Sequence, residues 1–194
     1  MQIVLLSYNA GNVQSVRNAL DRLGASYIVS SNPDEIRAAD KVIFPGVGEA
    51  STTMRFLKEH QLDAVIKNLR QPVLGICLGM QLMCSHSAEN DTPCLGIFNA
   101  TVKRFEAAPG HKVPHMGWNQ LTHVKGWLPE ALENQSVYFV HSFYVPVLAE
   151  TVAQTDYKLE FSAALQKDNF YAVQFHPEKS DRSGEMVIKR FLEI

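Results

Sequence analysis

The sequence predicts an α/β protein, with a mostly parallel central sheet flanked by helices and an antiparallel extension in the C-terminal half. In the first half, short apolar runs typical of strands buried on both faces alternate with segments of helical period. That alternation favours a parallel sheet with right-handed crossovers. The second half is mostly a succession of strand-like segments with few helices between them, which indicates antiparallel hairpins that extend or flank the sheet.

The first half is expected to contain alternating strands and helices. The expected strands cover residues 3–6, 25–30, 41–44 and 73–76. The expected helices run from Val13 to Leu23, from the turn before Pro33, over residues 51–69, and onward from Leu78. Gly24 is the expected C-terminal cap of the first helix, and Pro33 lies just inside the start of the second.

The second half is expected to contain strands and one terminal helix. The expected strands cover residues 102–105, 136–143, 151–155, 162–166 and 170–175. The helix is expected over residues 181–192, with its apolar side chains facing inward. No repeat, low-complexity tract or linker rich in Gly, Pro or Ser divides the sequence, so residues 1–194 are expected to form a single domain.

Composition and charge exclude several classes of protein. Hydrophobic residues make up 46% of the 194 residues, enough for a core that needs no disulfide or structural metal, which excludes disorder. The net charge of −2 provides no basic field for nucleic acid. The three cysteines cannot all pair with one another, and their spacing fits no zinc ribbon. The sequence shows neither a secretory signal nor a membrane-length apolar stretch, so we expect a cytoplasmic protein without metal, cofactor or membrane partner.

A candidate nucleophile lies where a buried strand gives way to a helix. Gly75 and Gly79 flank Cys77 at a distance of two residues, as in the nucleophile elbow of hydrolases that carry serine there. Glycine on both sides of so sharp a turn avoids collisions with neighbouring strands, and the start of a helix favours the thiolate. The alternative is a buried structural cysteine with glycines for packing. Cys84 is expected in the core of a helix and Cys94 in a loop.

A candidate base and its orienting group lie near the C-terminus. His176 and Glu178 follow a strand and are two residues apart, so extended backbone would project both side chains to one side. Pro177 keeps His176 out of helical geometry. Together with Cys77, these residues supply the nucleophile, base and orienter that hydrolysis of an amide requires. His141 is a competing base without a carboxylate two residues away, and a strand-end histidine beside a solvated glutamate is the simpler alternative.

Donors for a developing oxyanion are expected from the turn at residues 45–48 and from the amide of Leu78, which follows the candidate nucleophile. The turn follows a buried strand, and its glycines leave backbone N–H groups exposed. A phosphate loop is the less favoured interpretation, because no lysine follows and the Walker spacing is missing. A plain β-turn remains the alternative.

These elements, in this order, resemble the class I (triad) glutamine amidotransferases over nearly the whole chain. The general motifs are Gly75-Ile76-Cys77-Leu78-Gly79-Met80-Gln81 and Phe175-His176-Pro177-Glu178. Within the class, the chain looks most like the glutaminase subunit of imidazole glycerol phosphate synthase, of histidine biosynthesis. The motifs typical of that subunit are Phe44-Pro45-Gly46-Val47-Gly48, Pro114-His115-Met116-Gly117-Trp118-Asn119, Tyr138-Phe139-Val140-His141-Ser142 and residues 174–180.

The resemblance implies hydrolysis of L-glutamine to glutamate and ammonia by a triad of Cys77, His176 and Glu178. It makes Gly46 and Val47 the oxyanion segment, together with the amide of Leu78. The positions that match substrate-binding ones in the family are Gly48, Gln81, Glu89, Ser142 and Phe143. Glu89 alternatively only caps the end of a helix.

The resemblance also implies a partner that consumes the ammonia. This partner is a (β/α)₈-barrel cyclase subunit that makes imidazole glycerol phosphate and an aminoimidazole carboxamide ribotide. The candidate docking residues are Asn12, Met116, Trp118, Tyr138 and Lys179. An exposed tryptophan is a typical interface anchor, and a core position for Trp118 is the alternative.

The Gly46–Val47 peptide is free to reorient, so we expect the isolated chain to be nearly inactive until the partner turns a donor inward. Three rival interpretations are less favoured, because the motifs typical of the subunit and the complete set of Cys77, His176 and Glu178 argue against them. The chain could be the glutaminase subunit of another amidotransferase, serving anthranilate, aminodeoxychorismate or pyridoxal phosphate synthesis. It could be a cysteine enzyme of another class, or a non-catalytic scaffold of the same fold.

Overall fold

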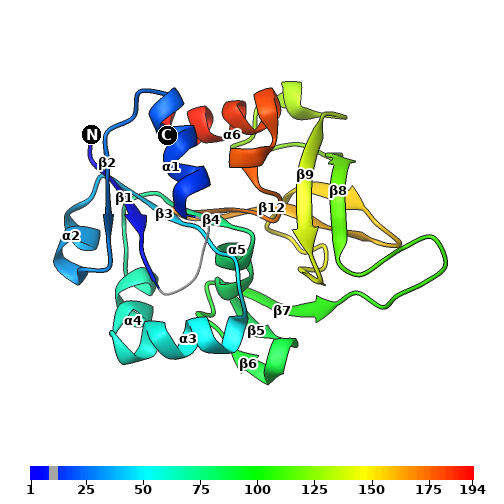
Figure 1. The fold of residues 1–194 in the computed structure, drawn as a ribbon, viewed down its shortest axis with the longest axis horizontal. Helices are drawn as coiled ribbons and strands as arrows, with labels where there is room; N and C mark the ends of the chain where they lie inside the picture. The colour runs from blue at the N-terminus through cyan, green and yellow to red at the C-terminus, as the bar shows by residue number, and fades with distance from the viewer. Residues whose placement is uncertain (9–12) are drawn as a thin grey trace.

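The computed structural model describes residues 1–8 and 13–194 and is built around a seven-stranded sheet (Figure 1). Its strand order is β11-β12-β13-β4-β3-β1-β2. The parallel strands are β1 (Ile3–Leu6), β2 (Tyr27–Ser30), β3 (Lys41–Phe44), β4 (Val73–Ile76) and β13 (Phe170–Val173). The antiparallel extension consists of β11 (Thr151–Asp156) and β12 (Glu160–Lys167). The predicted fold class is therefore confirmed.

Helices cover both faces of this sheet (Figure 1). One face carries α1 (Val13–Arg22) and α6 (Asp181–Glu193). The other carries α2 (Pro33–Ala38), α3 (Ala50–Glu59), α4 (Leu62–Lys67) and α5 (Leu78–Leu82). In β1, Ile3 and Leu5 pack toward the first group of helices, whereas Val4 and Leu6 pack toward the second. Because a strand presents successive side chains to opposite faces, a strand that is apolar at every position is buried on both.

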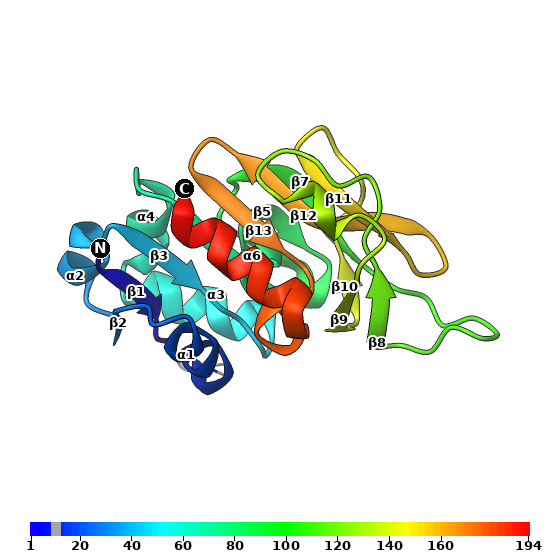
Figure 2. The same ribbon diagram turned by 90° about the horizontal axis from the view of Figure 1, so that it is seen from above.

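Smaller sheets lie beside the main one. One has four strands, β5 (Cys84–Ser87), β6 (Thr92–Pro93), β7 (Phe98–Arg104) and β10 (Phe143–Tyr144). Another is the hairpin of β8 (His115–Gln120) and β9 (Ser136–His141). Figure 2 shows this hairpin at the end of the molecule where β11 and β12 lie. Short 3₁₀ turns occur at η1 (Glu89–Asp91), η2 (Glu130–Leu132) and η3 (Pro177–Lys179).

Several sequence-based boundaries are wrong. The helix expected over residues 51–69 is broken at Gln61, whose backbone is left-handed with a φ of 56°, so that α3 and α4 are separate helices. The strand expected over residues 136–143 breaks at Ser142, and its two parts belong to different small sheets. Cys84 lies on β5 and not in a helix core, because α5 ends after five residues and the chain then pairs with β6 and β7. These are cases in which tertiary pairing overrides local pattern.

The order of the parallel strands places the candidate site residues at one edge of the sheet. β4 lies between β3 and β13 and runs parallel to both, with Phe44 opposite Gly75 and Val173 opposite Ile76. The segments that follow these three strands therefore leave the sheet side by side. The 45–48 turn, Cys77 and residues 174–178 converge there although they are far apart in sequence.

Candidate active site

Cys77 occupies the sharp turn between β4 and α5. Its backbone has a φ of 52° and a ψ of −105°, a conformation that costs a residue with a side chain about 1–3 kcal/mol. A Cβ on Gly79 would overlap the carbonyl of Phe44, and a Cβ on Gly75 would lie 2.9 Å from the sulfur of Met83. The flanking glycines thus remove side chains that the turn has no room for, and the strained backbone presents the Cys77 side chain at the strand end.

His176 and Glu178 form a buried pair behind this cysteine. His176 Nδ1 lies 2.8 Å from Glu178 Oε1, and each side chain is only 2% exposed. The expectation that extended backbone pairs these side chains is wrong, because Pro177 begins the turn η3 and does not continue a strand. The turn brings the carboxylate back under the ring. The other ring nitrogen, Nε2, is buried without a hydrogen bond to any described residue.

The protonation of His176 depends on its neighbours. Burial disfavours the imidazolium, but the nearby Cys77 thiolate and the Glu178 carboxylate outweigh burial and raise the pKa of His176. A proton is therefore held on the ring beside the sulfur. This is the charge distribution that a cysteine nucleophile with a histidine base requires.

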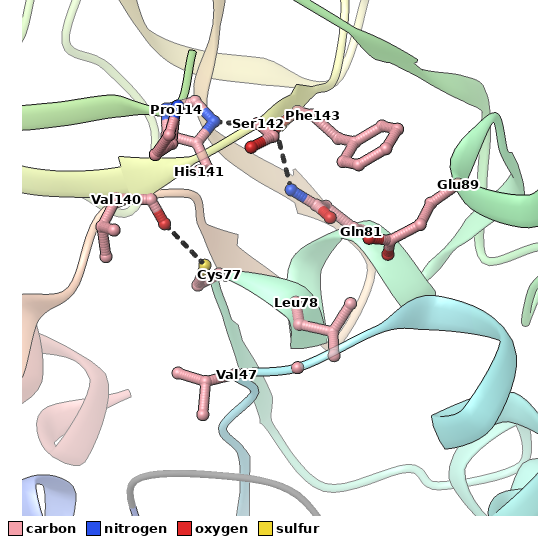
Figure 3. A pocket seen from close by; sticks show the side chains of 11 residues that line it. Val47, Cys77, Leu78, Gln81, Glu89, Pro114, Val140, His141, Ser142 and Phe143 are labelled. Carbon is pink, nitrogen blue, oxygen red and sulfur yellow. Dashed lines mark hydrogen bonds between the residues drawn. The ribbon is translucent and has the colours of Figure 1, made fainter.

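A cavity of about 350 Å³, lined by both polar and apolar residues, opens beside Cys77 (Figure 3). Its lining includes eight of the residues singled out from the sequence: Val47, Gly48, Cys77, Leu78, Gln81, Glu89, Ser142 and Phe143. Pro114, Val140 and His141 complete the wall. Its volume falls in the range typical of small-molecule sites. Gly46, His176 and Glu178 are not part of the lining.

Two buried glutamine side chains connect the cavity wall to the nucleophile. Gln81 Nε2 donates to the Phe143 carbonyl and to Gln174 Oε1, both at 3.0 Å. Gln174 Nε2 in turn lies 3.6 Å from the sulfur of Cys77. Sequence reasoning assigned no role to Gln174. The sequence feature that could have indicated a role is the position of this glutamine between the apolar residues Val173 and Phe175, since a buried side-chain amide needs hydrogen-bond partners.

Glu89 fits both sequence interpretations. One of its carboxylate oxygens accepts a hydrogen bond of 2.8 Å from the amide of Ala50, the first residue of α3, so it does cap a helix. It also lines the cavity. Burial and the neighbouring Glu49 raise the pKa of Glu89, against the opposing effect of the Ala50 amide.

Of the expected oxyanion donors, the amide of Leu78 is already engaged in this conformation. The amide of Leu78 donates to the carbonyl oxygen of Gly46 at 3.3 Å, so the Gly46–Val47 peptide directs a carbonyl at the expected donor. Gly46 has no room for a side chain, because a Cβ would lie 2.6 Å from the Leu78 Cβ and 2.7 Å from the Gly79 amide nitrogen. The Tyr8 hydroxyl donates to the carbonyl of Pro45 and holds the preceding peptide.

The family model of class-I glutamine amidotransferases matches residues 4–194. The chain belongs to this family. Among curated relatives, the imidazole glycerol phosphate synthase subunits HisH of Bacteroides fragilis and Bacteroides thetaiotaomicron are 58% and 57% identical over the whole of both chains. The subunit HisH of Idiomarina loihiensis is 44% identical over all of this chain and 98% of its own length.

Solved structures agree with the fold of a class-I glutamine amidotransferase. A crystal structure of a glutamine amidotransferase matches with a TM-score of 0.77 at 20% identity, covering 98% of this chain and 97% of that one. A chain in the structure of PurLQS from Thermotoga maritima matches with a TM-score of 0.72 at 15% identity, covering 99% and 97%. At such identities the likeness concerns the fold alone.

In this amidotransferase chain, both ring nitrogens of His141 are engaged in hydrogen bonds to other residues. Its Nδ1 lies 2.7 Å from the Phe143 carbonyl oxygen, and its Nε2 lies 3.0 Å from Nδ1 of the buried His115. A carbonyl oxygen only accepts, so the network assigns the proton of His141 to Nδ1, and Nε2 accepts from His115. Both nitrogens of His141 are engaged, which argues against its use as the base.

We expect the buried His115–His141 pair to make stability fall with acidity. Burial lowers the pKa of His115 to about 4. Burial also lowers the pKa of His141 to about 3 despite its hydrogen bond to Phe143, and His115 and His176 add to the lowering. Both values lie below that of an unfolded histidine, so the unfolded chain binds more protons in this window. The free energy of unfolding should therefore fall by up to about 1.4 kcal/mol per pH unit per histidine below pH ~6.5.

Urea unfolding of the wild type at about pH 6 and about pH 5, an interval that lies below the pKa of an unfolded histidine, measures this loss. His176 does not change the slope below pH ~6.5, because its raised pKa leaves it protonated in both states there. The variant His115→Asn, which keeps a donor near the position of Nδ1, should lose less stability over this interval. His123→Asn, at an exposed position with a positive φ, should behave as the wild type. Equal losses in all three proteins would contradict the prediction.

Four of the five expected docking residues can be placed, and Asn12 lies outside the described residues. Met116 and Trp118 project from β8 and are 62% and 56% exposed, so a core position for Trp118 is wrong. Tyr138, opposite Trp118 on β9, is half-buried, and the centres of the two rings are 6.0 Å apart. Lys179 is exposed on η3.

Among residues 1–8 and 13–194, no three His, Cys, Asp or Glu side chains are grouped as metal ligands would be. None of the helices in that part of the chain has the length and apolar character needed to cross a membrane.

Proposed function

We propose that this chain hydrolyses L-glutamine in histidine biosynthesis and passes the ammonia to a (β/α)₈-barrel cyclase subunit, which makes imidazole glycerol phosphate and an aminoimidazole carboxamide ribotide. The observation that carries the proposal is the placement of Cys77 on a strained turn with the buried His176–Glu178 pair behind it. The family supports the reaction. The names of the relatives support the pathway, since they are imidazole glycerol phosphate synthase subunits over their full length.

The geometry suggests a role for each member of the triad. His176 holds on Nε2 the proton that it has taken from the Cys77 thiol, the sulfur attacks the side-chain amide carbon of glutamine, and the histidine delivers that proton to the departing ammonia. Glu178 accepts from Nδ1, which fixes the ring and stabilises its imidazolium. Water activated by the same histidine then cleaves the glutamyl thioester and releases glutamate.

Substrate contacts come from the cavity wall. Glu89 provides a carboxylate for the α-ammonium group of glutamine, and the backbone amides at Ser142 and Phe143 face its carboxylate. The hydrogen bonds of Gln81 and His141 to the Phe143 carbonyl fix the orientation of that strand end. Gly48 lines the cavity without adding a side chain to it.

The partner is needed for a chemical reason. Free ammonia in neutral water is mostly protonated and is then no longer a nucleophile, so it has to be transferred directly to the next reaction. The exposed Met116, Trp118 and Lys179, together with the half-buried Tyr138, offer a surface for docking the cyclase subunit.

Labelling with a glutamine analogue that carries a diazoketone in place of the carboxamide tests this proposal. In the presence of the cyclase subunit and its nucleotide ligand, we expect one adduct per chain, on Cys77, and excess glutamine should prevent it. A Cys94→Ser variant should be labelled to the same extent, because Cys94 lies outside the cavity lining. Failure to label, or labelling that glutamine does not prevent, would favour a non-catalytic scaffold.

A further inference from the structure

The Phe143 carbonyl sets the direction of a buried hydrogen-bond chain. This oxygen accepts from Gln81 Nε2 at 3.0 Å and from His141 Nδ1 at 2.7 Å. A backbone carbonyl has no proton to give, so both partners must be donors. The side-chain amide of Gln81 therefore has its nitrogen, not its oxygen, on the side of Phe143.

The same nitrogen of Gln81 lies 3.0 Å from Gln174 Oε1, and this contact fixes the orientation of the Gln174 side-chain amide. Gln174 has to present its oxygen there, and its own nitrogen then lies 3.6 Å from the sulfur of Cys77. The reverse orientation would place two NH₂ groups face to face and would direct an oxygen at the sulfur. The assignment of this amide thus follows from its network.

We propose that Gln174 is a further catalytic residue, which donates a hydrogen bond to the Cys77 sulfur and stabilises the thiolate, in an orientation imposed by the Phe143 carbonyl through Gln81. The inference rests on the proposed role of Cys77 as nucleophile. Gln174 is fully buried, and its backbone amide is held by the Ala163 carbonyl at 2.8 Å, so the donor is fixed in position. A hydrogen bond from a buried donor to a charged group is stronger than one between neutral groups in water.

The sulfur needs such a donor. Among the described residues, the Val140 carbonyl is a further contact of the sulfur, at 4.0 Å, and it can only accept a hydrogen bond. The helix that begins after Cys77 has only five residues, so the dipole expected to favour the thiolate is short. Gln174 supplies a fixed N–H group where the negative charge resides.

The charged and titratable groups around Cys77 come from four other parts of the described fold. His176 lies on the segment after β13, with Glu178 behind it on η3. His141 on β9 lies close enough to His176 for the two rings to interact, and His176 contributes to the lowered pKa of His141. Tyr8 follows β1, and its hydroxyl is deeply buried and close enough to interact with Cys77. None of these groups is altered by a substitution of Gln174, so a change in thiolate formation can be attributed to the side-chain amide.

The test is the pH dependence of Cys77 alkylation by iodoacetamide, a neutral reagent that reports the thiolate. It is measured on the full chain carrying Cys94→Ser, alone and with the cyclase subunit. Gln174→Met keeps the size of the side chain and removes the donor, and Gln174→Glu directs a carboxylate at the sulfur. Gln154→Met, at a half-buried glutamine of β11, is the matched control.

We expect half-maximal alkylation of Gln174→Met at a pH higher by about one unit, which is a tenfold lower thiolate fraction at a given pH. Gln174→Glu should shift further, and Gln154→Met should follow the wild type. If Gln81 acts through Gln174, the double variant Gln81→Met/Gln174→Met should shift no further than Gln174→Met alone. Thermal unfolding of each variant verifies that it is folded.

Unchanged alkylation profiles for folded Gln174→Met and Gln174→Glu would overturn the inference while leaving the proposed function intact. A larger shift in the double variant would likewise overturn the role given to Gln81. Failure of the proposed function has a different signature, since the diazoketone analogue would then leave Cys77 of the wild type unlabelled whatever stands at position 174.

Discussion

Replacing Cys77 by alanine is expected to lower glutamine hydrolysis by the assembled complex about 10⁴-fold or more. The reason is that no other group replaces the sulfur at the end of β4. Cys84 lies buried on β5, and Cys94 lies outside the cavity lining. Steady-state release of ammonia, measured with the cyclase subunit and its nucleotide ligand present, gives the loss directly.

Assembly should survive this substitution. Cys77 is only 7% exposed at the base of the cavity, whereas Met116 and Trp118 project from the hairpin. The affinity for the cyclase subunit, measured by titration calorimetry, should therefore equal that of the wild type. Cys94→Ala is the matched control and should keep both activity and affinity. Activity retained in Cys77→Ala would contradict the assignment of the nucleophile.

The parts of the fold that follow from periodicity were predictable. Strands apolar at every position, such as residues 3–6, can only be buried on both faces, and that requires helices on either side of the sheet. Parallel strands carry the segments after them to one edge. The meeting of Cys77 with His176 and Glu178 therefore follows from the strand order once β4 and β13 are neighbours.

The remaining features depend on tertiary contacts that local pattern does not encode. The four residues of β5 have no strong strand propensity and are extended because β6 and β7 supply partners. The pairing of His176 with Glu178 was expected from extended backbone and arises from the turn η3 instead. The direction of the Gly46 carbonyl depends on the amide of Leu78, which lies far away in sequence.

The hydrogen bond from the Leu78 amide to the Gly46 carbonyl predicts that the chain without its cyclase partner hydrolyses glutamine slowly. Oxyanion stabilisation requires N–H groups directed at the developing charge, and removing one donor typically costs about 10²–10³-fold in kcat. Here the carbonyl of Gly46 accepts from the Leu78 amide, so its peptide offers an acceptor where a donor is needed. We therefore expect kcat for glutamine to rise by about 10²-fold or more when the cyclase subunit and its nucleotide ligand bind.

The division of the effect between kcat and KM identifies its origin. Rotation of the Gly46–Val47 peptide would free Leu78 and add the Val47 amide, which stabilises the transition state and raises kcat at nearly constant KM. Remodelling of the glutamine-binding wall would instead change KM. Trp118→Ala should reduce activation by weakening docking while leaving the rate of the free chain unchanged, because Trp118 is exposed and does not line the cavity. A free chain as fast as the complex would show that the carbonyl of Gly46 does not block the oxyanion site.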